Sequence, residues 1–455
     1  MRKIIIVLLS LAMMLLGGCR KEGNPGKADT DTVIEDFDYD QYLIYPVSYP
    51  EPNFYPDEKD FIKDGIMDTE GLSILYSAFA GRNADIETNR SFNRRLVPFY
   101  QTLMNKLLLS DSGNNVFSPV NLYYNLAALA AIAEDEARRE IYDVLGIDPE
   151  TAVDDYRRQW QDNVIAGKCT LNYANSIWFS DSLHLDMERV GKLADDYFVP
   201  AYRGKTGTKD YTAAFQSWIN DNTGKLLGKY ISDLKLDENV QMAMASTIYY
   251  STGWMEAYLP ENNKKEVFHG TDGDAEVEMM HKKSPMTYLE NGVFTGCIEQ
   301  TGTHSEMMIM LLPQQGVSFE QMFASEEFQE LIYGSDPGES GATYCLVDIT
   351  LPKFDVSGRY DLETLLPQIG VRKIFEGSGA FEKLADKALA LSAIEHACRI
   401  KADENGLEGA AYTVEIAVGG TPPVSVDLTF DRPFFFAVKT AFDNTVFFCG
   451  IVNQV

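Results

Sequence analysis

The chain has 455 residues, of which 45% are apolar and 12% aromatic, so it can bury a large core and is not intrinsically disordered. It has 39 Lys and Arg against 68 Asp and Glu, and a formal net charge of −29 opposes binding to a phosphate backbone, so we expect no nucleic-acid partner. Five His residues, without a Cys-x-x-Cys or His-Glu-x-x-His motif, leave little material for a metal site, and we expect no metal or other cofactor.

The first 18 residues have the pattern of an export signal. Met1-Arg2-Lys3 is a basic start, and residues 4–16 form an apolar run that is too short to span a bilayer comfortably. Leu16 to Cys19 resembles the bacterial lipobox, in which the Cys thiol is acylated. The resemblance implies a lipoprotein signal peptide over residues 1–18, and a membrane anchor on Cys19. An ordinary signal peptide with an incidental Cys is the alternative.

The lipobox resemblance also carries an expectation about location. Arg20, not Asp, follows Cys19, which favours an exported bacterial lipoprotein of the outer membrane, on its periplasmic or its cell-surface face.

Residues 19–70 differ in composition from the rest of the chain. From residue 20 to residue 70 there are 14 acidic and 5 basic residues, five Pro and five Tyr. The prolines exclude a long helix and the like charges favour an extended chain, so we predict an acidic tether that holds the folded domain off the membrane. The tyrosines are the one feature that favours a binding segment instead.

Apolar periodicity predicts helices in the next part of the chain. Ser91 to Leu109 has apolar residues at three- and four-residue spacing, which is typical of an amphipathic helix. Ser118-Pro119 opens a second helix that is apolar nearly all round through residues 126–131, so we expect it to be buried. Residues 185–202 and 211–233 also have a helical pattern.

From about residue 240 the pattern changes to short apolar runs bounded by turn residues, which predict strands. These runs are residues 248–250, 307–312, 345–349, 424–430, 434–438 and 445–448. Helices first and strands later, without regular alternation, favour an α+β fold with mainly antiparallel sheets over βαβ winding.

Five cysteines remain once Cys19 is assigned to lipid, and their odd number prevents complete pairing. They lie far apart, mostly in apolar runs, so we expect buried free thiols. They are Cys169, Cys297, Cys345, Cys398 and Cys449.

A series of short motifs runs through the buried helix and the strands. Asn115 to Pro119 opens the helix, Asp221 to Lys225 is a polar turn, and Ile248 to Tyr250 leads to Gly253-Trp254. Further motifs are Val267-Phe268-His269, Met279-Met280, Leu351-Pro352-Lys353-Phe354, Tyr360-Asp361-Leu362, Gly370, Asp431 to Phe436 and Phe448 to Asn453. In order and identity they resemble the motifs of the serpin family over about residues 90–455.

The resemblance implies one serpin domain over residues 71–455, with three mainly antiparallel β-sheets, about nine α-helices and an exposed reactive loop at about 404–430. A target protease cleaves that loop, the cut loop enters the largest sheet as a new strand, and the covalent acyl-enzyme is trapped. The chain would therefore be a monomeric protease inhibitor and not an enzyme, and its partner would be the target protease.

The expected hinge of the reactive loop begins at Glu404. An acid, any residue, Gly, a small residue, Glu and further small residues form the pattern that the family has at this place, and a strand of small side chains can enter a sheet most easily. The matching residues are Glu404, Gly406, Leu407, Glu408, Gly409, Ala410 and Ala411. Counting at the family's spacing puts the reactive bond at Gly420-Thr421, within a window of residues 417–422.

The expected loop suggests its target. Between Lys401 and Arg432 there is no Lys or Arg, so a trypsin-like enzyme is disfavoured. We expect elastase-like or subtilisin-like serine proteases, which prefer small or aliphatic residues, with cysteine proteases as a further class.

Three residues depart from the expected loop pattern. Leu407 stands where inhibitory members have Thr or Ser, and Tyr412 is bulky within a stretch of small residues. Strand alternation puts Leu407, Gly409, Ala411, Thr413, Glu415 and Ala417 on the buried face of an inserted strand, and Tyr412 on the outward face. Glu415 would then cost several kcal/mol if it were buried without a partner. These departures keep open a non-inhibitory serpin, acting as an envelope binding or structural lipoprotein.

Other residues match structural positions of the family. The resemblance implies that His396 lies beneath the largest sheet with Ser118 and Asn121 nearby, that Ser246 replaces the usual Asn, and that Trp254 packs at the top of the sheet. A buried polar group needs a partner, and these residues are expected to exchange partners when the sheet opens. No Gly-x-Ser-x-Gly elbow is present, so a Ser-His-Asp hydrolase is disfavoured. An envelope enzyme acting on glycans has only the aromatic, acidic tether in its favour.

Overall fold

The computed structural model describes residues 34–455, apart from residues 35, 56, 58–60, 64–65, 81–85, 111, 303–305, 335–340, 377–378, 390, 392 and 408–424. The described residues belong to one compact unit that begins at Ile34. Cys19 and the export signal lie outside the described residues. Within the described residues, no helix combines the length and the hydrophobicity that crossing a membrane requires.

Eleven α-helices occur in the described residues, where the sequence predicted about nine. Pro119 occupies the first turn of α4, and the hydroxyl of Ser118 accepts a hydrogen bond from the Asn121 N–H, so α4 begins where the sequence predicted. The helices are α2 (Thr69–Ala80), α3 (Ile86–Leu107), α4 (Pro119–Ile132), α5 (Asp135–Leu145), α6 (Ala152–Asn163), α7 (Met187–Tyr197), α8 (Lys209–Asp221), α9 (Gly228–Ile231), α10 (Phe319–Ala324), α11 (Glu326–Tyr333) and α12 (Leu362–Ile369).

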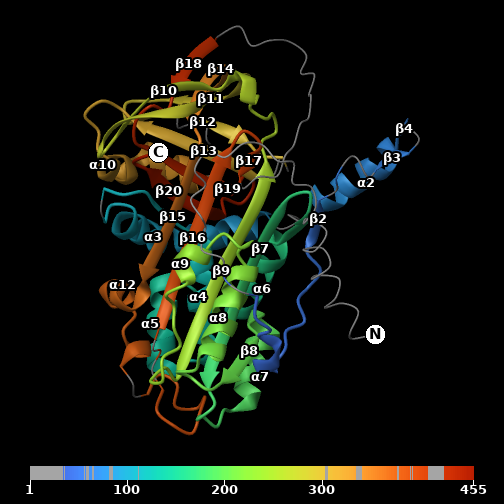
Figure 1. Ribbon diagram of the computed structural model, residues 1–455, viewed down its shortest axis with the longest axis vertical. Helices are drawn as coiled ribbons and strands as arrows, with labels where there is room; N and C mark the ends of the chain where they lie inside the picture. The colour runs from blue at the N-terminus through green and yellow to red at the C-terminus, as the bar shows by residue number, and fades with distance from the viewer. Residues whose placement is uncertain are drawn as a thin grey trace. The chain divides into compact units, whose positions relative to one another are not determined.

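One of two nine-stranded sheets contains the expected hinge and is called the main sheet below (Figure 1). Its strands, in spatial order, are β1 (Leu43–Tyr45), β8 (Ala201–Gly204), β7 (Thr170–Ser180), β9 (Met242–Gly253), β17 (Gly406–Leu407), β16 (Ala393–Asp403) and β15 (Phe354–Asp361). Two further short strands, β6 (Ile165–Gly167) and β2 (Asn53–Tyr55), continue it beyond β7. Most neighbours are antiparallel, but β9 and β16 are parallel where they pair directly.

A second nine-stranded sheet contains most of the C-terminal strands. Its order is β18 (Ser425–Thr429), β14 (Ala342–Pro352), β11 (Gly273–Glu290), β12 (Phe294–Gln300), β13 (Glu306–Pro313), β19 (Phe434–Thr440), β20 (Val446–Val452) and β5 (Asn115–Phe117), with β10 (Lys264–Gly270) on β11. The two smaller sheets that we expected are joined here, because β11 is 18 residues long and pairs with strands of both. The remaining sheet is the hairpin β3 (Ile62–Lys63) and β4 (Ile66–Met67).

Helices cover both faces of the main sheet. α4 is buried over almost its whole length and belongs to the principal core with both large sheets. On the opposite face, α8 packs on β7 and β9 through a separate apolar cluster, and Figure 1 shows α8 and α9 in front of the sheet. Trp178 of β7 anchors this cluster, because its ring stacks on Tyr202 at 4.2 Å and meets Phe215 of α8 edge-on. An inserted strand would therefore face α4 on one side and α8 on the other.

The N-terminal segment from Ile34 to Tyr55 packs on the rest of the unit. β1 adds a strand to the edge of the main sheet, and Tyr42 meets Tyr211 of α8 edge-on at 4.9 Å. Tyr49 stacks on Trp160, and Tyr55 is 1% exposed and donates to the Gly302 carbonyl at 2.7 Å. The compact unit thus starts well before the boundary expected at residue 70, because these aromatic side chains pack on the folded part of the chain, with Tyr55 fully buried and Tyr49 still 36% exposed.

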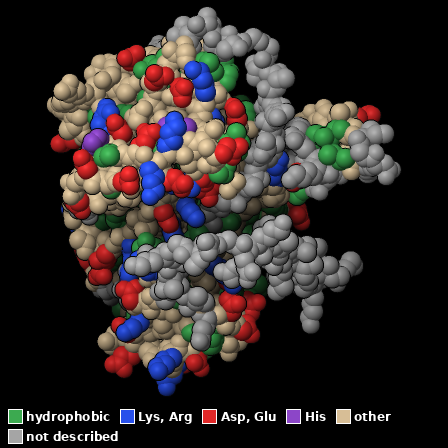
Figure 2. Space-filling view, turned by 45° about the horizontal axis from the view of Figure 1, so that its top comes forward, with side chains coloured by type: hydrophobic (Ala, Val, Ile, Leu, Met, Phe, Trp, Pro, Cys, Tyr) green, Lys and Arg blue, Asp and Glu red, His purple; other side chains and the backbone are tan. Residues whose placement is uncertain are grey.

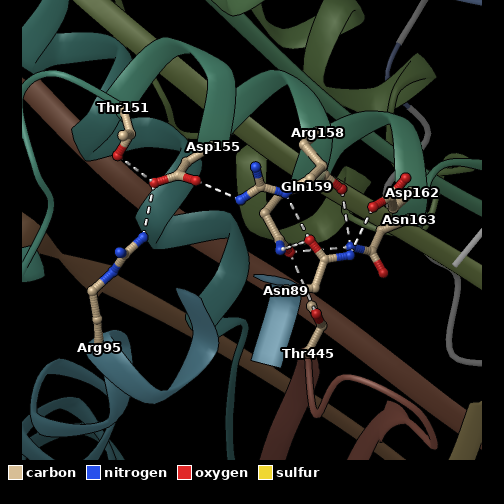
Figure 3. A network of polar contacts seen from close by, with 9 residues as sticks. All are labelled: Asn89, Arg95, Thr151, Asp155, Arg158, Gln159, Asp162, Asn163 and Thr445. Carbon is tan, nitrogen blue, oxygen red and sulfur yellow. Dashed lines mark hydrogen bonds and ion pairs between the residues drawn. The ribbon is translucent and has the colours of Figure 1, made fainter. Parts of the chain in front are cut away.

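A polar network fixes α3 and α6 to the turn between β19 and β20 (Figure 3). The Asn89 amide oxygen accepts hydrogen bonds from Arg158 and Gln159, and its amide nitrogen donates to Asp162 at 2.7 Å. The hydroxyl of Thr445, in the turn between β19 and β20, donates a hydrogen bond to the Gln159 side-chain oxygen. Asn89, Gln159 and Thr445 have no exposed surface, so each needs the others to replace lost water.

The five described cysteines are free and buried, which confirms the prediction made from their spacing. On the face drawn in Figure 2, acidic and basic side chains are interspersed, and the described residues there form no continuous basic area.

Candidate functional site

The expected hinge lies at one end of the main sheet, where β9 ends at Gly253, Trp254 follows it, and β16 ends at Asp403. We call this end the head, and the end at residues 242–246 and 393–396 the base. Glu404, Gly406 and Leu407 are described. The other expected hinge residues (Glu408, Gly409, Ala410, Ala411) and the expected bond Gly420-Thr421 lie outside the described residues.

At the head, β17 lies between β9 and β16 as a short central strand. Gly406 and Leu407 pair antiparallel with Gly253 and Thr252 of β9. On the other side, Leu407 pairs with Ala402 of β16. Leu407 has no exposed surface, so the departure from the family's Thr or Ser is accommodated by packing in the principal core.

Gly406 is required at its position by its backbone. Its φ is +151°, and a Cβ atom there would lie 2.2 Å from the Thr252 carbonyl oxygen. A larger residue would therefore prevent the chain from turning into the sheet at this point.

Three N–H groups hold the chain immediately before β17. The Trp254 N–H donates to the Asn405 carbonyl at 3.1 Å, and the Tyr258 N–H donates to the Glu404 carbonyl at 3.0 Å. The Trp254 indole N–H donates to the Asp403 carbonyl at 2.8 Å. Trp254 thus lies at the head, and its side chain binds the hinge itself.

The Glu404 side chain is held as well. Its carboxylate accepts from Lys353 at 2.6 Å and from the Asn263 amide, and Lys353 also binds Glu278 at 2.6 Å. Partial burial alone would raise the pKa of Glu404, but the Lys353 hydrogen bond and the other donors outweigh it, and the pKa of this carboxyl is lowered. The hinge therefore enters the sheet from a fixed, charged anchor.

A buried ion pair lies against the side chains of Trp254 and Tyr258. The sequence analysis did not predict it. Lys282 of β11 pairs with Glu299 of β12, and both side chains are almost fully buried. The Lys282 ammonium also lies 4.2 Å from the Tyr258 ring centroid, and the Tyr258 hydroxyl donates to Glu299 at 3.0 Å. The only signal in the sequence is a Lys and a Glu at inward positions of apolar strands, which does not reveal that they meet.

Ser118, Asn121, Ser246 and His396 come together beneath the main sheet, near its base. The Ser118 N–H donates to His396 Nε2 at 3.0 Å, and the Ser246 hydroxyl donates to the Asn121 side-chain oxygen at 2.5 Å. His396 Nδ1 and Asn121 Nδ2 are buried and have no hydrogen-bond partner among the described residues. Each unpaired atom costs free energy in this state of the protein.

The two central strands pair directly only at the base. Ala393 to His396 of β16 pair parallel with Ala243 to Ser246 of β9. Above that point, residues 397–401 and 247–251 are all described and have no direct pairing with each other. The main sheet is therefore closed at the base, open along its middle, and occupied by β17 at the head.

Among the described residues, no group of His, Cys, Asp and Glu side chains could hold a metal ion. The hinge is a short strand that begins inside the main sheet, between two strands that do not pair with each other directly beyond it until the base.

The chain belongs to the serpin family. The family model described as "Serpin (serine protease inhibitor)" matches residues 96–455. Members of this family are generally protease inhibitors.

Relatives and solved structures agree with this assignment. The chain is 25% identical to Serpin A3-7 of Bos taurus over 78% of this chain and 87% of that protein. It is 26% identical to corticosteroid-binding globulin of Sus scrofa over 82% of this chain and 93% of that protein. The native structure of the thermophilic serpin tengpin superposes with a TM-score of 0.71 at 22% identity, covering 80% of this chain and 94% of tengpin. The fold class predicted from the sequence is confirmed.

The buried His396 predicts acid sensitivity of the main sheet. Burial lowers the pKa of His396 to about 3 from an ordinary value of 6.5, so the folded protein holds the neutral imidazole. The unfolded chain then binds more protons between pH 6.5 and pH 3, and the stability present above pH 6.5 falls by about 1.4 kcal/mol per pH unit below it. We expect the melting temperature of His396→Gln, whose amide oxygen can still accept from Ser118, to fall less between pH 7 and pH 4 than that of the natural protein. An equal fall in the melting temperature of the two proteins between pH 7 and pH 4 would contradict the low pKa assigned to His396.

Proposed function

We propose that the protein is a suicide inhibitor of serine proteases, cleaved near Gly420-Thr421 and consumed in one turnover. The observation that carries this proposal is β17, which already occupies the head of the main sheet between β9 and β16. Cleavage of the loop frees residues 408–420 from their C-terminal connection, so that they can continue this strand toward the base.

Continuing the strand is energetically favourable in its first part. Residues 247–251 and 397–401 have no direct pairing with each other, so the new strand would form hydrogen bonds there without breaking any between β9 and β16. Each net hydrogen bond contributes about 1 kcal/mol, and burial of apolar surface adds to this. A complete strand would gain on the order of 10 kcal/mol, comparable to the whole stability of an ordinary domain.

The register of β17 identifies what each loop residue would meet. If it continues unchanged, Ala411 faces the core between Ile248 and Cys398, which suits a small side chain. Glu415 would come between Met244 and Ile394, both almost fully buried. A carboxylate in that position costs several kcal/mol, so we infer that insertion is strongly favoured down to Val414 and weakly beyond it.

The proposed target follows from the loop sequence. Its lack of Lys and Arg and its small and aliphatic residues fit elastase-like or subtilisin-like serine proteases, with cysteine proteases as a further class.

A second candidate is a non-inhibitory serpin that binds a ligand or acts as a structural lipoprotein. The names of two similar proteins, corticosteroid-binding globulin and human thyroxine-binding globulin, state that they bind a corticosteroid and thyroxine. Tyr412 and Glu415 in the loop favour this candidate, because both are unusual on an inserting strand. It predicts that cutting the loop leaves the melting temperature nearly unchanged.

We also propose that the mature protein is an exported monomer anchored in the bacterial outer membrane by lipid on Cys19. The lipobox resemblance supports this.

The inhibitor proposal predicts a covalent complex. Incubation with pancreatic elastase should give an SDS-stable band at the summed mass of the two proteins, and intact-mass analysis should place the released C-terminal peptide at a cut within residues 417–422. The cut inhibitor should melt well above the uncut protein, because it has gained a strand. A nicked inhibitor with full recovery of elastase activity and an unchanged melting temperature would favour the second candidate.

Strand alternation predicts opposite effects at two neighbouring loop positions. Ala411→Glu puts a carboxylate on the buried face, which costs several kcal/mol. Elastase should therefore cut this variant, dissociate from it with its activity retained, and form little covalent complex. Ala410→Glu is the matched control, because continuing the same register would point its side chain outward beside Arg399. Equal complex formation by the two variants, measured by gel densitometry, would contradict the proposed insertion.

The anchor proposal is tested by Cys19→Ala in a bacterial host. We expect the natural chain in the detergent-soluble membrane fraction and the variant in the soluble exported fraction. The same distribution for both proteins would contradict the proposed lipid anchor and would not bear on the assigned fold.

A further inference from the structure

A cavity of about 230 Å³ lies between α8 and the main sheet. Its floor is made of small residues on the outer face of the two central strands, Ala243 and Ala245 of β9 and Ala397 of β16. Its roof includes Phe215 and Ile219 of α8. Figure 1 shows α8 and α9 lying across this part of the sheet. The cavity therefore lies over the line along which a new central strand would pass.

One end of the cavity is polar. Arg359 of β15 donates to Asp233 at 2.8 Å, and both residues line the cavity. The Asp233 side chain is 69% exposed, so this end is open to water. Lys235 and Asp237 also line the cavity, while α8 and the alanines of the central strands supply apolar surface. A side chain with an apolar body and a polar tip therefore suits this lining.

The register of β17 brings particular loop residues to this cavity. Gly406 pairs with Gly253 and Leu407 with both Thr252 and Ala402, and each further loop residue meets one earlier residue on each strand. Tyr412 would then lie between Thr247 of β9 and Ala397 of β16. Val414 would follow beside Ala245, and Ile416 beside Ala243.

The sides of the main sheet on which the neighbouring strand residues lie agree with this register. Leu407 belongs to the principal core, on the α4 side of the sheet, together with Met244, Cys398 and Ala402. Side chains alternate along a strand, so Tyr412, Val414 and Ile416 would point to the other side. Ala243, Ala245 and Ala397 are on that side, in contact with the α8 cluster.

We propose that the cavity beneath α8 is the docking site for the Tyr412 ring, followed by Val414 and Ile416, when residues 408–418 enter the main sheet. This inference rests on the proposed function. An apolar cavity of about 150 Å³ can hold a benzene ring, so the space is sufficient for the Tyr412 ring. The phenol hydroxyl would then point toward the polar end at Asp233 and Arg359, which suits a side chain with an apolar body and a polar tip.

The proposal gives the bulky Tyr412 a role in a stretch of small residues. The loop needs small side chains on its α4 side, where the core is already filled, and large ones on its α8 side, where space is present before the strand arrives. Filling this space would add apolar burial to the cut protein and none to the uncut one.

The test compares melting temperatures of uncut and elastase-cut proteins. Tyr412→Ala should leave the uncut protein unchanged and lower the melting temperature of the cut protein by roughly 5 °C, because a cavity remains where the ring would pack. Tyr412→Phe, which keeps the ring, should lose much less. Equal melting temperatures of cut Tyr412→Ala and the cut natural protein would overturn the proposal.

A second variant tests the cavity from the other side. Ala397→Leu puts a larger side chain into the space, so the uncut protein should keep or slightly raise its melting temperature, while the cut protein loses part of its gain. Combining it with Tyr412→Ala should restore part of that gain, because the leucine then occupies the place of the ring. Additive losses in the double variant would overturn direct packing. If the cut natural protein gains no stability at all, the proposed function itself fails, and this outcome is distinct from both results above.

Discussion

A strand can enter a β-sheet only where two neighbouring strands leave main-chain hydrogen-bonding groups available to it. The main sheet meets this constraint at its head, where β9 and β16 bond to Gly406 and Leu407. It does not meet it at the base, where the same two strands bond to each other. His396 and Ser246 form the uppermost of these direct pairs, and both bond to residues at the start of α4. The junction beneath the sheet thus marks the point that further insertion has to open.

A buried ion pair stabilises the head of the main sheet, where burying charged groups costs free energy. Removing Lys282 and Glu299 from water costs several kcal/mol per ion, and their attraction offsets this only because the Tyr258 hydroxyl and ring and the Glu256 carbonyl complete their contacts. The result is a rigid Trp254–Tyr258 segment whose N–H groups fix residues 403–405. With its start fixed in this way, a strand that continued beyond Leu407 would keep the register of β17.

Much of this architecture could be predicted from the sequence. The all-round apolar pattern of residues 126–131 identified the buried α4, and the order of short motifs identified the family and hence the fold. The helix expected over residues 185–202 ends at Tyr197, because Phe198 adopts a left-handed conformation and the chain then enters β8. Residues 34–55 were expected to extend as a tether, because composition records their charge and prolines but not the surfaces that receive Tyr42 and Tyr49.

The candidate site was less predictable for a related reason. A motif identifies residues that are close in the chain, as Glu404, Gly406 and Leu407 are. It does not identify a pair such as Lys282 and Glu299, whose contact depends on the register of β11 and β12 within a curved sheet. The same holds for the gap between residues 247–251 and 397–401, which is a property of two strands and is visible in neither alone.

The elements that cover the sheet connect its two halves across this gap. α8 packs on β7 and β9 through Phe215, whereas Arg399 of β16 donates to the Leu226 carbonyl at 2.8 Å and Arg359 of β15 binds Asp233. A strand that entered between β9 and β16 at the base, where they now pair directly, would separate them by about 4.8 Å, and hydrogen bonds of 2.8 Å cannot stretch so far. Insertion as far as the base would therefore shift the segment from α8 to Asp233 or break its arginine contacts. The same widening would enlarge the space beneath α8, so the cost of opening the sheet and the gain from burying outward side chains would arise in the same place.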